Sequence, residues 1–101
     1  MIYILISFFL FSAAAKVSYI SKSKSIRLGM TVSLSCIGKG NPDPYVAWIS
    51  PNGTMLQNTS SLTNTNLTIN NVTRPFCGVY TCIASNMFGT DKEMTSIVCK
   101  L

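Results

Sequence analysis

Apolar and polar residues alternate along most of the chain after Lys16, and this two-residue period is typical of β-strands. In the stretch MTVSLSC, Val32, Leu34 and Cys36 alternate with hydroxyl side chains, which predicts a strand with one apolar and one polar face. The same alternation predicts strands in YVAWIS (45–50), NLTIN (66–70) and GVYTCIAS (78–85). Helical spacing is not sustained in this part of the chain, so we expect an all-β domain.

Residues with strong turn preferences separate these strands. Prolines interrupt GKGNPDP (38–44), Asn52-Gly53 is a tight-turn signal, and the stretch 86–89 precedes a last strand that ends near Cys99. The segment 57–65 is rich in Thr, Asn and Ser, and we expect it to connect two strands. Short strands at this turn spacing predict a two-sheet antiparallel β-sandwich.

The first fifteen residues, MIYILISFFLFSAAA, have the pattern of a secretory signal. Their apolar run is too short to span a bilayer, and it ends in three alanines of the kind that signal peptidase accepts before Lys16. We therefore predict a signal peptide at 1–15 and one secreted domain at 16–101, with no stable membrane insertion after cleavage. Because no Lys or Arg precedes the run, an uncleaved anchor stays open as an alternative. A buried N-terminal strand is less favoured, because ten consecutive apolar residues without a turn suit a translocation signal better.

An exported chain is expected to form disulfides, because the secretory pathway is oxidising. The chain has four cysteines: Cys36, Cys77, Cys82 and Cys99. A zinc site is disfavoured, since the sequence contains neither a histidine nor a CxxC pair.

The sequence gives no support for catalysis. Its only acidic residues are Asp43, Asp91 and Glu93, and no base or nucleophile pattern accompanies them. We therefore predict no catalytic residue, no metal site and no cofactor.

Two of the cysteines belong to a spaced pattern of large residues. Cys36 and Cys82 lie on the inward faces of their predicted strands, Trp48 follows the first by twelve residues, and Tyr80 precedes the second by two. With this pattern the chain resembles an immunoglobulin domain of the I-set or C2-like type. The resemblance covers about residues 26–98 and rests on Ile26, Gly29, Val32, Leu34, Cys36, Gly40, Pro42, Pro44, Trp48, Leu67, Ile69, Val72, Gly78, Tyr80, Cys82, Ala84, Asn86 and Gly89. The 46 residues from Cys36 to Cys82 leave no room for the additional strand pair of variable-type domains.

The resemblance implies that a Cys36–Cys82 bridge joins the two sheets, that Trp48 packs on the bridge, and that the Tyr80 hydroxyl bonds back to the backbone at a corner. The chain departs from the family at Phe76, where an acidic residue is usual, so Arg74 lacks an obvious partner. Cys77 and Cys99 are also additions to the common pattern.

The predicted last hairpin brings the two additional cysteines together. A turn centred near residues 87 and 88 places Cys77 opposite residue 98, within bridging range of Cys99. Of the three connectivities we therefore favour Cys36–Cys82 with Cys77–Cys99. An interchain bond from Cys77 or Cys99 to a partner is the alternative.

The two outer faces of the sandwich differ in composition. Outward residues of the strands at 30–36 and 66–70 are all polar, and four glycosylation sequons fall nearby, at Asn52, Asn58, Asn66 and Asn71. On the opposite sheet, which corresponds to strands C, F and G of the resembled fold, the outward residues are largely apolar. A monomer seldom exposes such a patch without a partner, although a glycan, Lys92 or another strand could cover it. We expect partner binding through Tyr45, Ile49, Val79, Ile83, Met87 and Phe88.

The resemblance implies extracellular protein–protein recognition, by adhesion or receptor–ligand binding, with an extracellular or cell-surface protein or a second copy as partner. One alternative is a soluble host or viral decoy that binds a cytokine or an immune receptor. Another is a matrix component that binds polyanions weakly, because the formal charge is +5 and Lys22, Lys24 and Arg27 cluster. Solvated edge charge explains this cluster more simply, and nucleic acid is not an expected partner. The chain is also consistent with a fragment of a tandem array.

Overall fold

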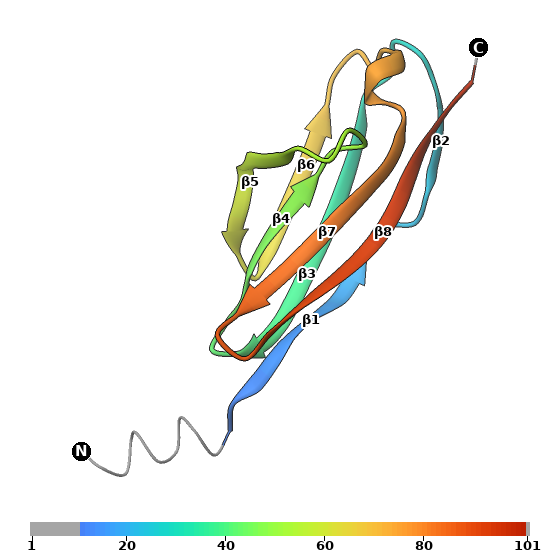
Figure 1. Ribbon diagram of the computed structural model, residues 1–101. Coiled ribbons are helices and arrows are strands. Elements are labelled where there is room, and N and C mark those ends of the chain that lie inside the picture. Colours follow the sequence, from blue (N-terminus) through green and yellow to red (C-terminus); the bar gives the residue numbers. More distant parts are fainter. Residues whose placement is uncertain (1–10, 101) are drawn as a thin grey trace.

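The chain folds into two packed antiparallel sheets with one added parallel edge strand. The computed structural model describes residues 11–100, apart from the side chains of residues 57 and 58. Its elements are β1 (Ala13–Ile20), β2 (Lys24–Arg27), β3 (Val32–Asn41), β4 (Tyr45–Ile49), β5 (Met55–Leu62), β6 (Asn64–Ile69), the short helix η1 (Arg74–Phe76), β7 (Gly78–Asn86) and β8 (Gly89–Lys100). One sheet has the order β1-β3-β6 and the other β2-β8-β7-β4-β5 (Figure 1), which confirms the predicted two-sheet β-sandwich.

The core lies where the alternating apolar side chains of both sheets meet. The Cys36–Cys82 disulfide joins β3 to β7 across the sandwich with a Cα–Cα distance of 6.5 Å. Trp48 lies in this core and is fully buried, as are Leu34 and Val72. In the chain-entropy model, closing this loop contributes about 4 kcal/mol to stability.

Tyr80 ties the core to the η1 end of the molecule. Its side chain is buried, and its hydroxyl donates a hydrogen bond of 2.7 Å to the carbonyl oxygen of Phe76. Burial raises the pKa of the Tyr80 phenol, so the group stays protonated and remains a donor at neutral pH. This is the corner bond that the resemblance implied.

A second disulfide, Cys77–Cys99, joins β8 to the residue that precedes β7, with a Cα–Cα distance of 5.9 Å. The register of the hairpin pairs Gly78 with Ile97, which places the two cysteines diagonally across adjacent strands. Both disulfides favoured on sequence grounds are therefore present.

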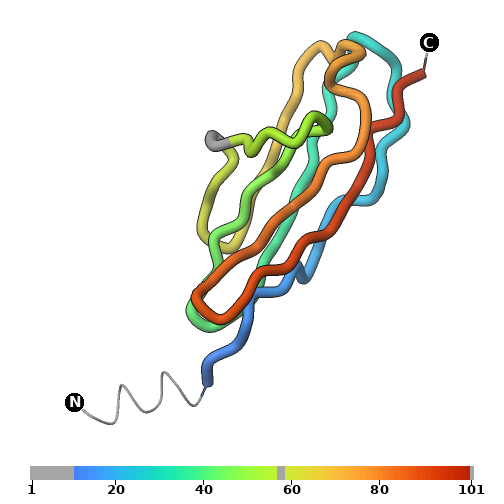
Figure 2. The backbone as a smooth tube through the Cα atoms, in the orientation of Figure 1, coloured from blue at the N-terminus to red at the C-terminus, as the bar shows by residue number. Residues whose placement is uncertain are grey.

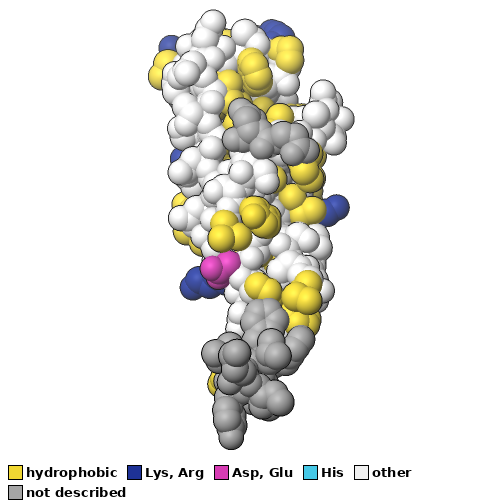
Figure 3. Space-filling model, turned by 90° about the vertical axis from the view of Figure 1, so that its left-hand side faces the viewer, with side chains coloured by type: hydrophobic (Ala, Val, Ile, Leu, Met, Phe, Trp, Pro, Cys, Tyr) yellow, Lys and Arg dark blue, Asp and Glu magenta, His cyan; other side chains and the backbone are white. Residues whose placement is uncertain are grey.

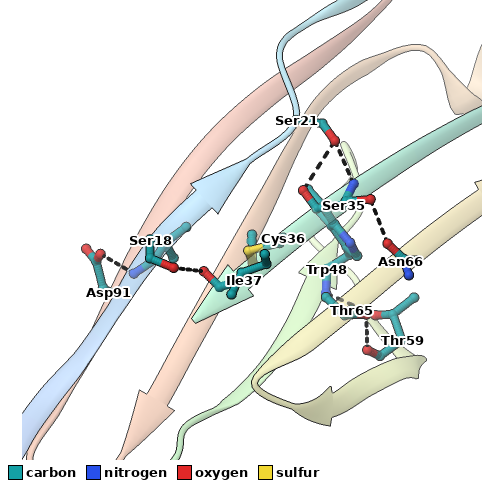
Figure 4. Close-up of a disulfide and its surroundings, with 12 residues drawn as sticks. Ser18, Ser21, Ser35, Cys36, Ile37, Trp48, Thr59, Thr65, Asn66 and Asp91 are labelled. Atoms are coloured by element: carbon teal, nitrogen blue, oxygen red, sulfur yellow. Dashed lines mark hydrogen bonds between the residues drawn. A yellow bond between two sulfur atoms is a disulfide. The ribbon is translucent and has the colours of Figure 1, made fainter. Parts of the chain in front are cut away.

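The polar segment expected to be a connection instead forms most of β5, which pairs with β4 at the edge of the five-stranded sheet. The Thr59 hydroxyl accepts a hydrogen bond of 3.0 Å from the Trp48 amide (Figure 4), so this polar side chain pairs with a backbone group of the neighbouring strand. Thr63, with φ of 64°, then turns the chain into β6. An edge strand of this kind shows no apolar alternation, because much of it faces solvent.

The first strand begins inside the segment that we predicted to be cleaved. Ala15 is 1% exposed, and its amide donates to Asn86 Oδ1 at 3.2 Å, while Asn86 Nδ2 donates to the Ala13 carbonyl at 2.8 Å. Cleavage before Lys16, which remains a prediction, would remove these contacts, and most of the apolar run lies outside the described residues.

The start of β1 and the end of β8 lie at opposite ends of the long axis (Figure 2). Within residues 11–100, no helix is long and apolar enough to cross a membrane.

We predict that Tyr80→Phe lowers the free energy of unfolding by about 1 kcal/mol, because it removes the partly buried hydrogen bond from the Tyr80 hydroxyl to the Phe76 carbonyl. Urea denaturation measures the change. Tyr45→Phe is the control, because Tyr45 is exposed. Equal stabilities for the two variants would contradict the assigned bond.

Candidate functional site

The outer face of the five-stranded sheet consists of the side chains that alternate, along each strand, with the side chains buried in the core. On β7, Tyr80 and Cys82 point inward, so Val79 and Ile83 point outward. The register places Ile83 beside Ala47 of β4 and beside Lys92 of β8. The outward apolar residues of these strands and of β5 form one surface, which we call the apolar face: Tyr45, Ile49, Met55, Leu62, Val79, Ile83, Met94 and Val98.

Side chains on the apolar face are exposed to different degrees. Tyr45, Val79 and Met94 are exposed, whereas Ile49 and Ile83 are half-buried between their neighbours. Ala47 also points outward but is buried, because its small side chain lies at the floor of a shallow hollow of about 230 Å³. Tyr45, Met55 and Ile83 surround this hollow. The face therefore offers an apolar surface with a depression at its centre.

A single charged side chain interrupts the described outward rows between Tyr45 and Met94. This is Lys92, which is exposed and lies opposite Ile83. Asp91 has a structural contact instead, since its carboxylate accepts a hydrogen bond of 2.8 Å from the Val17 amide of β1 (Figure 4). The apolar face thus has little charge to desolvate when it is covered.

The structure adds four residues to the face that sequence reasoning did not name. Met94 and Val98 could have been found by extending the alternation of β8, in which Thr95 and Ile97 are buried. Met55 and Leu62 lie on β5, which the polar sequence concealed.

Met87 and Phe88 lie at the tip of the β7–β8 hairpin, beside the face. Asn86 holds this tip: its Oδ1 accepts a hydrogen bond of 2.9 Å from the Phe88 amide, and its Nδ2 donates one of 2.9 Å to the Pro42 carbonyl in the β3–β4 loop. Met87 is the more exposed of the two side chains. These residues therefore extend the apolar surface at the end where β4 begins with Tyr45.

The outer face of the three-stranded sheet is largely polar, as expected. Ser33 and Thr68 share a hydrogen bond of 3.0 Å, and the Ser35 hydroxyl donates one of 2.6 Å to Asn66 Oδ1 (Figure 4). The exception is an exposed pair, Tyr19 and Ile37, which are partners in the β1–β3 register. The sequence did not predict this pair, because β3 continues beyond Cys36, where the predicted strand ended, and no strand was predicted at Tyr19.

Three of the four sequon asparagines, Asn52, Asn66 and Asn71, are exposed and lie outside the apolar face. The side chain of Asn58 falls outside the described residues. Asn66 uses its Oδ1 to accept the bond from Ser35, which leaves Nδ2 available for a glycan. Sugars at these sites would cover parts of the surface other than the apolar face.

Comparison with known proteins finds a matching family model and relatives of similar sequence. A family model described as "Immunoglobulin domain" matches residues 16–86. The zebrafish leucine-rich repeat and fibronectin type III domain-containing protein 1-like protein is 42% identical over 73 residues, which are 69% of this chain and 11% of that protein. Vascular endothelial growth factor receptor 2 of the mouse is 30% identical over 80 residues, which are 76% of this chain and 6% of the receptor. The chain thus spans a small part of these relatives.

Solved structures share the fold. A chimeric titin Z1Z2 structure superimposes with a TM-score of 0.77 at 23% identity, covering 88% of this chain and 96% of that one. The immunoglobulin domains 1–5 of Sidekick-1 give a TM-score of 0.72 at 24% identity, over 87% of this chain and 20% of that one.

We expect glycans at Asn52, Asn66 and Asn71 when the chain is secreted from eukaryotic cells, because each asparagine and its sequon threonine are exposed. Enzymatic deglycosylation in heavy-oxygen water, followed by peptide mass spectrometry, marks each occupied asparagine. Unmodified peptides at all three positions would contradict this expectation.

Proposed function

The chain belongs to the immunoglobulin domain family, and we propose that it is a secreted recognition domain that binds another extracellular protein through its apolar face. Its relatives include a growth factor receptor and a matrix-remodeling-associated protein, so protein–protein recognition is supported in general terms. Binding through the apolar face, and secretion of the chain, are proposals that go beyond this general role.

The contrast between the two outer faces carries the proposal. One face pairs hydroxyl and amide side chains and lies near glycosylation sequons, whereas the other presents a largely apolar surface across β5, β4, β7 and β8, with Lys92 as its one described charged side chain between Tyr45 and Met94. Contiguous apolar patches on soluble domains commonly mark interaction sites. Flexible Met55 and Met94 suit such a site, because methionine adapts to the shape of a partner.

Secretion is supported by the chemistry of the cysteines. The two disulfides leave no free cysteine in the chain, and disulfides of this kind persist in oxidising compartments. An extracellular location would also allow the sequons to be used. A second copy of the chain is one partner that the apolar face could accept.

We predict that Ile83→Lys weakens partner binding at least about tenfold, because it removes apolar contact area and introduces a charge that a partner covering the face would have to desolvate. Biolayer interferometry against a partner found by screening extracellular receptor domains measures the affinity. Sedimentation velocity tests self-association in the same variant.

The matched control is Ser33→Lys, which introduces the same charge at an outward strand position on the other sheet. Circular dichroism should show both variants folded. Full binding by Ile83→Lys together with loss of binding by Ser33→Lys would assign the working surface to the other sheet.

A further inference from the structure

Three cationic side chains converge at the end of the sandwich opposite the β7–β8 hairpin. Arg27 of β2 and Lys100 of β8 are partners in adjacent parallel strands, which places their Cα atoms about 4.8 Å apart. Arg74 of η1 and Lys100 both line a pocket of about 190 Å³, together with Leu28 and the Cys77–Cys99 disulfide. We call Arg27, Arg74 and Lys100 the basic end.

The second disulfide holds these cations together. Lys100 follows Cys99 directly, and the Cys77 amide donates a hydrogen bond of 3.0 Å to the Arg74 carbonyl. The bond between Cys77 and Cys99 therefore fixes the two segments that carry Arg74 and Lys100. Like charges repel, so this covalent link maintains a proximity that electrostatics opposes.

Within residues 11–100, no acidic side chain lies near the basic end. Asp43 is in the β3–β4 loop and Asp91 and Glu93 are at the start of β8, toward the opposite end. Glu93 precedes Lys100 by seven residues along the strand, about 23 Å, which exceeds two Debye lengths at physiological salt. On the face shown in Figure 3, the acidic side chains lie just below the middle, next to a Lys or Arg side chain, and only Lys and Arg side chains appear as charged groups at the top. The described acidic side chains thus do not neutralise the positive charge of the basic end.

We propose that the basic end binds the sulfate groups of an extracellular sulfated polysaccharide. The pocket has room for an oxyanion, and the guanidinium of Arg74 matches the geometry of one with paired hydrogen bonds. A polymer with repeated sulfates can contact several such cations, whereas a single anion reaches the pocket alone. This site is separate from the apolar face and does not depend on it.

The test compares two variants that each lose two positive charges. Arg74→Ser with Lys100→Ser removes cations of the basic end, whereas Lys16→Ser with Lys39→Ser removes another exposed pair of strand neighbours, on the other sheet. We expect the first variant to bind heparin about tenfold more weakly at 0.15 M NaCl and the second to change less than about twofold. Equal losses in both variants, or no heparin binding by the parent chain, would overturn the proposal.

Three further ligands identify the ligand class, and one further variant tests the role of the disulfide. Fully desulfated heparin should not bind. Tighter binding to a single-stranded oligonucleotide of equal charge, or binding of inorganic sulfate without binding of heparin, would reject the polysaccharide. Cys77→Ala with Cys99→Ala should weaken heparin binding while the Cys36–Cys82 bridge keeps the fold, and unchanged binding would show that the disulfide does not position the site.

Discussion

The Cys36–Cys82 disulfide, packed with Trp48 between the sheets, fixes which side chains of the strands that it joins face the core. Side chains alternate along a strand, so fixing Cys82 toward the core also fixes Val79 and Ile83 toward solvent. The register carries this choice to β4 and β8, which pair with β7 on either side. The apolar face is therefore a consequence of the core bridge. On these strands, every second side chain points away from the core, and no further sheet or helix of the described chain covers it.

Part of this arrangement could be predicted from the residues alone. The strand cores and the outward positions on β4 and β7 follow from alternation, and the Cys77–Cys99 bridge follows from the hairpin near residue 87. The Cys36–Cys82 bridge was expected because the resemblance to an immunoglobulin domain implies it. β5 could not be predicted in this way, because an edge strand with polar side chains has no apolar period. The start of β1 was not predicted for another reason: the sequence of Ala13 to Ala15 was interpreted as a cleavage site, and this prediction stands untested. The contacts of Ala13 and Ala15 in β1 are made by Asn86, which is distant in the sequence.

The surface divides into regions with different chemistry on one small sandwich. The polar sheet satisfies its hydroxyl and amide groups across strands, the opposite sheet is apolar, and cations gather at the end closed by the Cys77–Cys99 disulfide. The two disulfides thus act differently. One sets which side chains face inward, and the other holds the segments at the C-terminal end of β8 in place.

Hydroxyl-radical footprinting of the complex with a protein partner tests whether the partner covers the apolar face, because it reports the accessibility of individual side chains. Tyr45 and Met94, which are 64% and 69% exposed, lie on the apolar face. Tyr19 and Met30, which are 52% and 56% exposed, lie away from it and serve as internal references. The account predicts that binding protects Tyr45 and Met94 from oxidation and leaves Tyr19 and Met30 reactive. Protection of Tyr19 with full reactivity of Met94 would contradict it.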